Sequence, residues 1–185
     1  MKRISFYGKI LFFVLAVVVF TGCSVIKYKT QDEKRWELSA EESGQLARET
    51  RELQNEIVDA FSQGDVTRIQ NFFSKDAIEK NPSLEEQINH AIDFLDGKIV
   101  SYDEPWLWRG TEGKEISYGA KNFSVKTDMG TEYRIGFKGW YRYEDDPDKI
   151  GVRFIYLINE TKRLELEGRG DTDAEDKFFR KIGKL

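Results

Sequence analysis

The N-terminal segment, residues 1–26, constrains this chain more than any other part of it. Three basic residues, Lys2, Arg3 and Lys9, precede an unbroken apolar run from Ile10 to Phe20. A positive start, an apolar core of about 7–15 residues and small residues after it are typical of a secretory signal. The charges stay on the cytoplasmic side while the apolar run enters the bilayer. The pattern therefore predicts that the rest of the chain is exported.

The signal ends in Thr21-Gly22-Cys23, and Cys23 is the only cysteine, so no internal disulfide can form. Phe20-Thr21-Gly22-Cys23 resembles a lipobox, a signal in which the cysteine is diacylated and the peptide before it is removed. The resemblance implies a signal peptide over 1–22 and a lipidated Cys23 that anchors the protein on the extracytoplasmic face of the cell membrane. Phe20 stands where Leu, Val or Ile is usual. The alternative is an uncleaved anchor formed by the uncharged residues 10–26.

The exported part of the chain is acidic. The whole chain has 29 Lys and Arg, 33 Asp and Glu and a formal net charge of −4, and loss of the three basic residues of the signal lowers it to −7. Nucleic-acid binding needs a basic footprint, so nucleic acid is excluded as a partner. An acidic body is not expected to be drawn to an anionic membrane either, so the lipid on Cys23 should hold it there.

The mature chain begins with a polar tether over residues 23–39 and continues with helical patterns. Apolar residues recurring at three- and four-residue steps predict three amphipathic helices, within residues 40–63, 66–73 and 84–95. Ser39 followed by Glu42 has the spacing of a capping box at the start of the first helix. The apolar faces supply predicted core residues, namely Phe72, Phe73, Ile92 and Leu95.

After Gly97 the period of the apolar residues changes to two. This alternation predicts four strands, over 98–104, 116–127, 131–144 and 152–158, with Phe154 and Leu157 in the last of them. Helices followed by a meander imply one α+β domain over 40–160, with three helices packed on one face of an antiparallel sheet of about four strands. Residues 161–185 are mostly charged, and we interpret them as a poorly ordered tail.

The order of these elements, together with several short motifs, resembles that of a known protein family. Gly64-Asp65, Phe72-Phe73-Ser74 and the segment DGKIVSY at 96–102, together with the lipobox, resemble an uncharacterised family of bacterial lipoproteins in the nuclear-transport-factor-2-like superfamily. The resemblance covers residues 43–158 and implies a cystatin-like cone, in which a curved sheet wraps the helices. In that superfamily the cavity at the open end holds a small apolar ligand, forms a catalytic site or is plugged by side chains, and this family carries no assigned reaction.

The sequence contains no motif typical of a metal site, a nucleotide-binding site or a catalytic nucleophile. His90 is the only histidine and Cys23 the only thiol, so structural zinc is excluded. The sequence has no Gly-x-Ser-x-Gly elbow and no phosphate-binding glycine loop. The acidic run at 144–149 lacks the spacing of a calcium loop, and we interpret it as a solvated turn. Arg-Gly-Asp at 169–171 matches a cell-adhesion tripeptide, and we interpret the match as chance. We therefore predict no metal, no cofactor and no catalytic residue.

Aromatic residues in the second half of the domain form the candidate site. Alternate residues of one strand, such as Tyr133, Phe137 and Tyr141, should point to one face of the sheet. One interpretation is that they only fill the core; the other is an aromatic-lined ligand cavity with tyrosine hydroxyls as polar groups. The predicted cavity residues are Trp106, Trp108, Tyr133, Phe137, Trp140 and Tyr141.

These patterns predict a function of a broad kind. We expect a membrane-anchored, non-catalytic module of the cell envelope that binds a small apolar ligand or another envelope protein. The alternative is an enzyme of the isomerase or dehydratase type, which would need a positioned acid or base in the cavity. Asp103 and Glu104 lie near the aromatic set in the sequence, but no recognisable pair of catalytic groups is present.

Overall fold

The computed structural model describes residues 38–112, 115–168 and 179–183. The signal peptide, Cys23, most of the tether and the Arg-Gly-Asp tripeptide lie outside the described residues. Residues Leu38–Leu185 form one compact unit that contains every described helix and strand. No helix in this part of the chain has the length and hydrophobicity needed to cross a bilayer.

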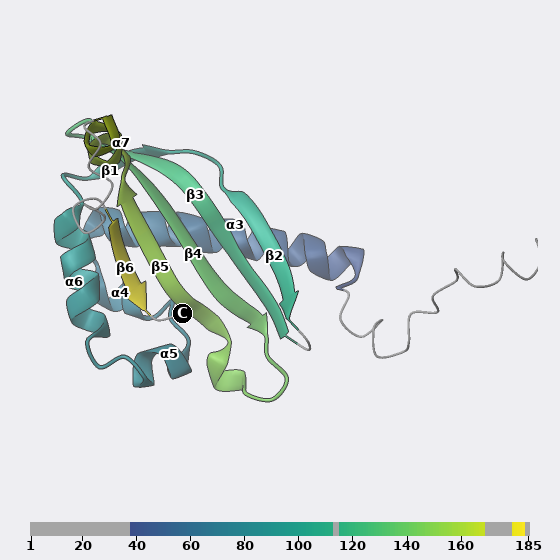
Figure 1. Ribbon diagram of the computed structural model, residues 1–185. Coiled ribbons are helices and arrows are strands. Elements are labelled where there is room, and N and C mark those ends of the chain that lie inside the picture. Colours follow the sequence, from purple (N-terminus) through teal and green to yellow (C-terminus); the bar gives the residue numbers. More distant parts are fainter. Residues whose placement is uncertain (1–37, 113–114, 169–178, 184–185) are drawn as a thin grey trace, which may run out of the picture. The chain divides into compact units, whose positions relative to one another are not determined.

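Four helices precede the sheet, and a fifth follows its fifth strand (Figure 1). They are α3 (Ala40–Gln63), α4 (Val66–Gln70), α5 (Lys75–Glu79), α6 (Leu84–Phe94) and α7 (Glu160–Gly168). The predicted capping box at the start of α3 is confirmed. The backbone N–H of Glu42 donates to Ser39 Oγ at 3.1 Å, and the backbone N–H of Ser39 donates to the Glu42 carboxylate at 2.8 Å.

The prediction of three helices is therefore wrong in number. The polar segment after Phe73, for which the sequence pattern predicts no helix, forms α5. Ser74 begins this helix, because its hydroxyl accepts a hydrogen bond from the backbone N–H of Ala77 at 3.2 Å. A five-residue helix has too few turns to show an apolar period, so the pattern could not reveal it.

The sheet is antiparallel and has six strands instead of the predicted four (Figure 1). Their order is β1-β3-β4-β5-β6, with β2 also paired to β3. The strands are β1 (Ile99–Tyr102), β2 (Trp106–Glu112), β3 (Glu115–Thr127), β4 (Glu132–Arg142), β5 (Gly151–Asn159) and β6 (Phe179–Gly183). The α+β class with an antiparallel sheet is thus confirmed.

The expectation of a poorly ordered tail is wrong for the segment that forms β6. This strand pairs with β5 over five residues, and Ile182 is 0% exposed opposite Ile155. It lies between β5 and α6, and the backbone N–H of Gly183 donates to the side chain of Gln87 in α6 at 3.0 Å. The apolar residues of β6, Phe179 and Ile182, are separated by Arg180 and Lys181, so the segment has no alternation from which to predict a strand.

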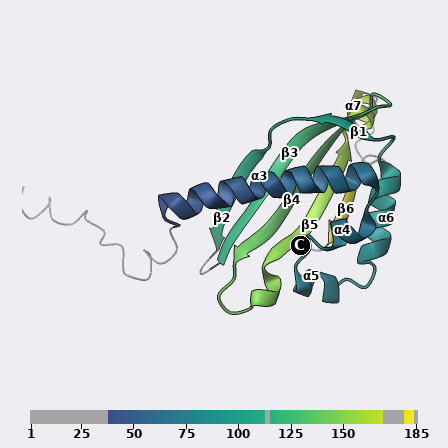
Figure 2. The same cartoon turned by 180° about the vertical axis from the view of Figure 1, so that it is seen from behind.

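The two faces of the sheet have different surroundings. Helix α3 runs across one face, as the view from behind shows (Figure 2). On that face Ile57 and Phe61 of α3 pack with Ile135 and Phe137 of β4, all at most 3% exposed. We call the opposite face of the sheet, which carries the side chain of Lys138 of β4, the outer face.

The predicted core residues differ in how far they are buried. Phe73, Leu95 and Leu157 are buried in the core. Phe72 and Ile92 pack against the core but remain partly exposed. Phe154 is also partly exposed, and its ring lies beside that of Tyr156 at a centroid distance of 6.5 Å.

Candidate functional site

The structure does not bring the six predicted cavity residues into one cavity. Tyr133 and Phe137 are each 1% exposed in the core, where the Tyr133 hydroxyl donates to the backbone oxygen of Phe94 at 3.0 Å. Trp106 is 81% exposed at the start of β2. Trp108 and Trp140 lie on the outer face, where the Lys138 ammonium is 4.9 Å and 5.7 Å from their ring centres.

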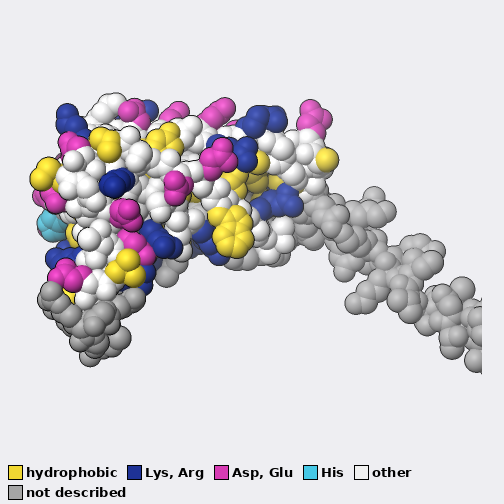
Figure 3. All heavy atoms as spheres, turned by 90° about the horizontal axis from the view of Figure 1, so that it is seen from above, with side chains coloured by type: hydrophobic (Ala, Val, Ile, Leu, Met, Phe, Trp, Pro, Cys, Tyr) yellow, Lys and Arg dark blue, Asp and Glu magenta, His cyan; other side chains and the backbone are white. Residues whose placement is uncertain are grey.

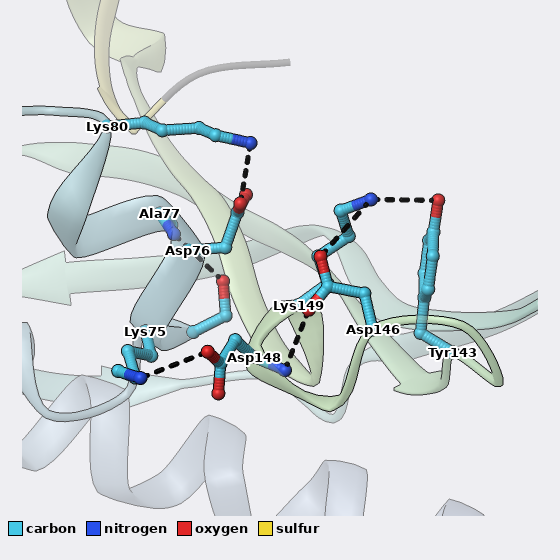
Figure 4. Close-up of polar contacts among 9 residues, drawn as sticks. Lys75, Asp76, Ala77, Lys80, Tyr143, Asp146, Asp148 and Lys149 are labelled. Carbon is cyan, nitrogen blue, oxygen red and sulfur yellow. Dashed lines mark hydrogen bonds and ion pairs between the residues drawn. The ribbon is translucent and has the colours of Figure 1, made fainter.

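A cleft opens where Trp140 reaches the end of the sheet, beside α5 and the turn between β4 and β5. Its volume is about 330 Å³, and we call it the α5 cleft. It is lined by Ser74, Asp76, Ala77, Lys80, Asn81, Trp140, Tyr143, Lys149 and Arg153. Figure 4 shows the polar contacts that Lys75, Lys80 and Lys149 make beside it.

The backbone fixes α5 against β5 on one side of this cleft. Ser74 N–H donates to the Val152 carbonyl at 2.9 Å, and Val152 N–H donates to the Phe72 carbonyl at 3.0 Å. The neighbouring Gly151 has φ 125°, and a Cβ there would lie 3.0 Å from Ser74 N. Glycine is therefore required where the two segments meet. The cleft is built on paired backbone, which holds its side chains in fixed positions.

Ion pairs tie the β4–β5 turn to α5 (Figure 4). Lys75 Nζ lies 3.0 Å from an Asp148 carboxylate oxygen, and this hydrogen bond and charge raise the pKa of Lys75. Within α5 and its end, Lys80 pairs with Asp76 at 2.6 Å. The acidic run predicted as a solvated turn is thus used in ion pairs.

Lys149 takes a different partner inside the cleft (Figure 4). Its ammonium donates to the Tyr143 hydroxyl at 3.2 Å and lies 4.2 Å from the centre of the Tyr143 ring. The carboxylate of Asp146 is farther away, at 3.6 Å. The hydrogen bond that Lys149 donates to Tyr143 is the largest cause that raises the pKa of Lys149. Lys149 therefore stays protonated over the whole physiological range of pH.

Arg153 is the third cation of the cleft, and a bulge in β5 positions it. Lys138 pairs with Phe154 and Gly139 with Val152, so Arg153 is the extra residue between them. Its guanidinium lies 5.3 Å from the Trp140 ring centre. Among the described residues no carboxylate forms an ion pair with Arg153, so its charge is held in place without being neutralised.

A second cavity of about 290 Å³ lies between α3 and the sheet. It is lined by two of the six predicted residues, Trp140 and Tyr141, together with Tyr118 and Glu49. Burial, and to a smaller extent the charge of Glu49, raise the pKa of Tyr118 to about 12. Glu49 itself is exposed and accepts a hydrogen bond from the side-chain amide of Gln45 at 2.7 Å. A buried carboxylate facing this hydroxyl is not found among the residues that line the cavity.

Other residues considered from the sequence lie outside both cavities. His90 is exposed on α6, and Asp103 and Glu104 are exposed between β1 and β2. No group of three or more potential metal ligands occurs among the described residues. The α5 cleft was missed because its three cations come from α5, the turn and β5, and each is an ordinary basic residue in a highly charged sequence.

Comparisons with known proteins give one family. A family model described as a domain of unknown function, DUF5104, matches residues 56–160. The matched segment includes every residue that lines the α5 cleft. No curated protein matches the chain.

Proposed function

This chain belongs to the DUF5104 family of domains of unknown function, and we propose that it is an exported, lipid-anchored binding module whose α5 cleft takes an anionic ligand. One observation carries the proposal. Three cationic side chains from three segments, Lys80, Lys149 and Arg153, line a cleft that a single carboxylate, Asp76, also lines. Asp76 pairs with Lys80, and Asp146 lies 3.6 Å from Lys149, so Arg153 is the cation of the cleft that has no carboxylate partner among the described residues. Lys149 adds a second positive charge that can attract a ligand.

The geometry of these two cations favours a carboxylate or a phosphate. Hydrogen bonds from an ammonium or a guanidinium to an anionic oxygen are about twice as strong as those between neutral groups. A guanidinium also presents parallel N–H groups that match two oxygens of one anion. Trp140 and Tyr143 add apolar surface, with ring centres 5.5 Å apart. The cleft volume is near the lower end of ligand sites, which suits a small molecule or a terminal group.

The location in the cell follows from the N-terminal pattern. We propose that residues 1–22 are removed and that Cys23 is diacylated, which gives stable anchoring because each buried methylene contributes about 0.8 kcal/mol. Mass spectrometry of protein extracted from membranes is expected to find no peptide from 1–22 and a modified Cys23. Recovery of that peptide attached to an unmodified Cys23 would contradict this and favour the uncleaved anchor.

We also propose that the domain is a cone of the nuclear-transport-factor-2-like superfamily. The order of helices before an antiparallel sheet supports this, as does α3 lying across one face. An isomerase or dehydratase remains the alternative function, and it would use the cavity beside α3. With a pKa of about 12, Tyr118 stays protonated near neutral pH and is no base there. Binding is therefore the better supported proposal.

Variants of the cleft test the proposal. With inorganic phosphate as the probe, we expect residues 24–185 to bind in the millimolar range, and Arg153→Met and Lys149→Met each to weaken binding about tenfold. Each loses a charge-assisted hydrogen bond worth roughly 1.5 kcal/mol. Isothermal titration calorimetry measures the affinities. Lys75→Met is the control, because Lys75 carries the same charge nearby but does not line the cleft. Equal losses in all three variants would show a general charge effect and contradict a specific site.

A further inference from the structure

The outer face of the sheet combines basic and aromatic side chains on several strands. Its lysines are Lys121 of β3, Lys138 of β4 and Lys181 of β6. Each lies over an aromatic ring. Lys121 and Lys138 are 5.3 Å and 4.9 Å from the Trp108 ring centre, and Lys181 is 4.8 Å from that of Phe154. The rings hold the lysine stems and leave ammonium groups spread across the face.

Glycines allow Trp108 to lie against the backbone of the sheet. A Cβ at Gly110 or at Gly119 would come within 2.9 Å of the Trp108 ring. The indole therefore rests over these two glycines, and the two lysines lie above it. Arg153 extends the same surface to Trp140, at 5.3 Å from the ring centre. The basic and aromatic side chains thus form one continuous set, which we call the outer patch: Trp108, Lys121, Lys138, Trp140, Arg153, Phe154 and Lys181.

Three cations of the outer patch have no carboxylate partner among the described residues. Among the described residues, no carboxylate forms an ion pair with Lys121, Arg153 or Lys181. The pKa of Lys181 is lowered, first by burial and then by the charge of Arg153, so these two cations repel each other. This local excess of positive charge occurs on a chain whose net charge is −4. An anionic partner would relieve the repulsion.

An exposed tryptophan lies beside this patch. Trp106 is 81% exposed and pairs in register with Lys121. Figure 3 shows exposed hydrophobic side chains among Lys, Arg, Asp and Glu on the surface seen from above. Tryptophan beside lysine is typical of the interface between membrane and water, where the indole enters the headgroup layer and lysine contacts anionic headgroups.

We propose that the outer patch, with Trp106 at its edge, docks on the anionic lipid surface to which the chain is anchored. This inference rests on the proposed anchor at Cys23 and not on the ligand of the cleft. Between Cys23 and α3 there are 16 residues, 24–39, which span at most about 58 Å when extended. That length lets any face of a domain of this size reach the membrane. The positive charge of the outer patch complements the negative charge of the lipid surface, so we expect this face to contact the membrane.

Vesicle binding tests this docking without the anchor. Residues 24–185, which lack Cys23, are mixed with phosphatidylglycerol vesicles and separately with phosphatidylcholine vesicles, and bound protein is measured by sedimentation. We expect binding only to the anionic vesicles, and loss of binding at high salt. The triple variant Lys121→Glu, Lys138→Glu, Lys181→Glu should bind roughly a hundredfold more weakly, because each basic residue near an anionic surface contributes about fivefold in affinity.

A matched control reverses three exposed cations outside the patch, in Arg48→Glu, Arg51→Glu, Lys98→Glu. This variant has the same net charge as the first and should lose less than about fivefold. Brominated lipid should quench tryptophan fluorescence in the wild type, and less in Trp106→Ala. The proposal is overturned if the wild type does not bind anionic vesicles at low salt, if both triple variants lose equally, or if soluble polyglutamate binds more tightly than the vesicles.

The outcome is separable from the test of the cleft. Lys149 lines the cleft and is not part of the outer patch, so Lys149→Met should keep the affinity of the wild type for anionic vesicles. Loss of phosphate binding in Lys149→Met with intact vesicle binding would support both sites independently. Vesicle binding without any phosphate binding would support membrane docking by the outer patch and contradict the anion site in the α5 cleft.

Discussion

Replacing Phe73 by alanine is expected to lower the free energy of unfolding by about 3–5 kcal/mol, the usual cost of removing a buried phenylalanine ring. Phe73 is 5% exposed and belongs to the core cluster. A Cβ at Gly183 would lie 2.9 Å from its Cε1 atom, so the ring reaches β6. Its backbone also forms a bridge with Val152 in β5. The ring therefore joins the helical layer to the edge of the sheet beside the α5 cleft.

Urea unfolding followed by circular dichroism measures this loss. Phe72→Ala is the matched control. Phe72 is also a phenylalanine and directly precedes Phe73, but its side chain is only partly buried against the core. Its expected loss is at most half as large. A loss below about 1 kcal/mol in Phe73→Ala, or equal losses in the two variants, would contradict the packing described for α5 and β5.

The second large effect concerns β6. Ile182→Asp is expected to abolish the folded state at ordinary temperature, because Ile182 is 0% exposed and an aspartate there would be buried among apolar side chains. The substitution loses roughly 1.5–3 kcal/mol of apolar burial and adds the cost of an unpaired polar group. Together these approach the roughly 5–15 kcal/mol by which domains are stable.

The neighbouring Lys181→Asp is the control for this effect. Lys181 lies on the outer face over Phe154, so the charge change there is exposed to water on one side. This variant should remain folded in thermal unfolding and in size-exclusion chromatography. A cooperative transition at the wild-type midpoint in Ile182→Asp would show that β6 is dispensable and that the charged tail predicted from the sequence is the better description.

The sequence predicts the elements that are long and periodic. Helix α3 has several turns of apolar residues and a capping box, and β4 alternates over its length, so both are recognised. In contrast, α5 and β6 have five residues each, and their stability comes from contacts with β5. Such contacts join residues far apart in the chain. A periodicity argument within one segment cannot detect them.

The candidate site also depends on contacts between distant residues, which the sequence pattern does not reveal. The sequence pointed to aromatic residues as candidates by their type, but the pattern could not tell that Tyr133 fills the core while Trp140 borders a cleft. Lys75 and Asp148 meet although 73 residues separate them. Net charge has a similar weakness, because it averages the acidic residues of the whole chain with the outer patch. An acidic chain can therefore carry a basic face.

The most direct test of the central claim is to observe where an anion binds. Residues 24–185 labelled with nitrogen-15 are titrated with inorganic phosphate, and amide shifts are followed by NMR. We expect saturable shifts grouped around Lys80, Lys149 and Arg153, which line one cleft. The shifts should disappear in the double variant Lys149→Met, Arg153→Met. Shifts that do not saturate, or that group around Tyr118 and Glu49 in the second cavity, would contradict an anion site in the α5 cleft.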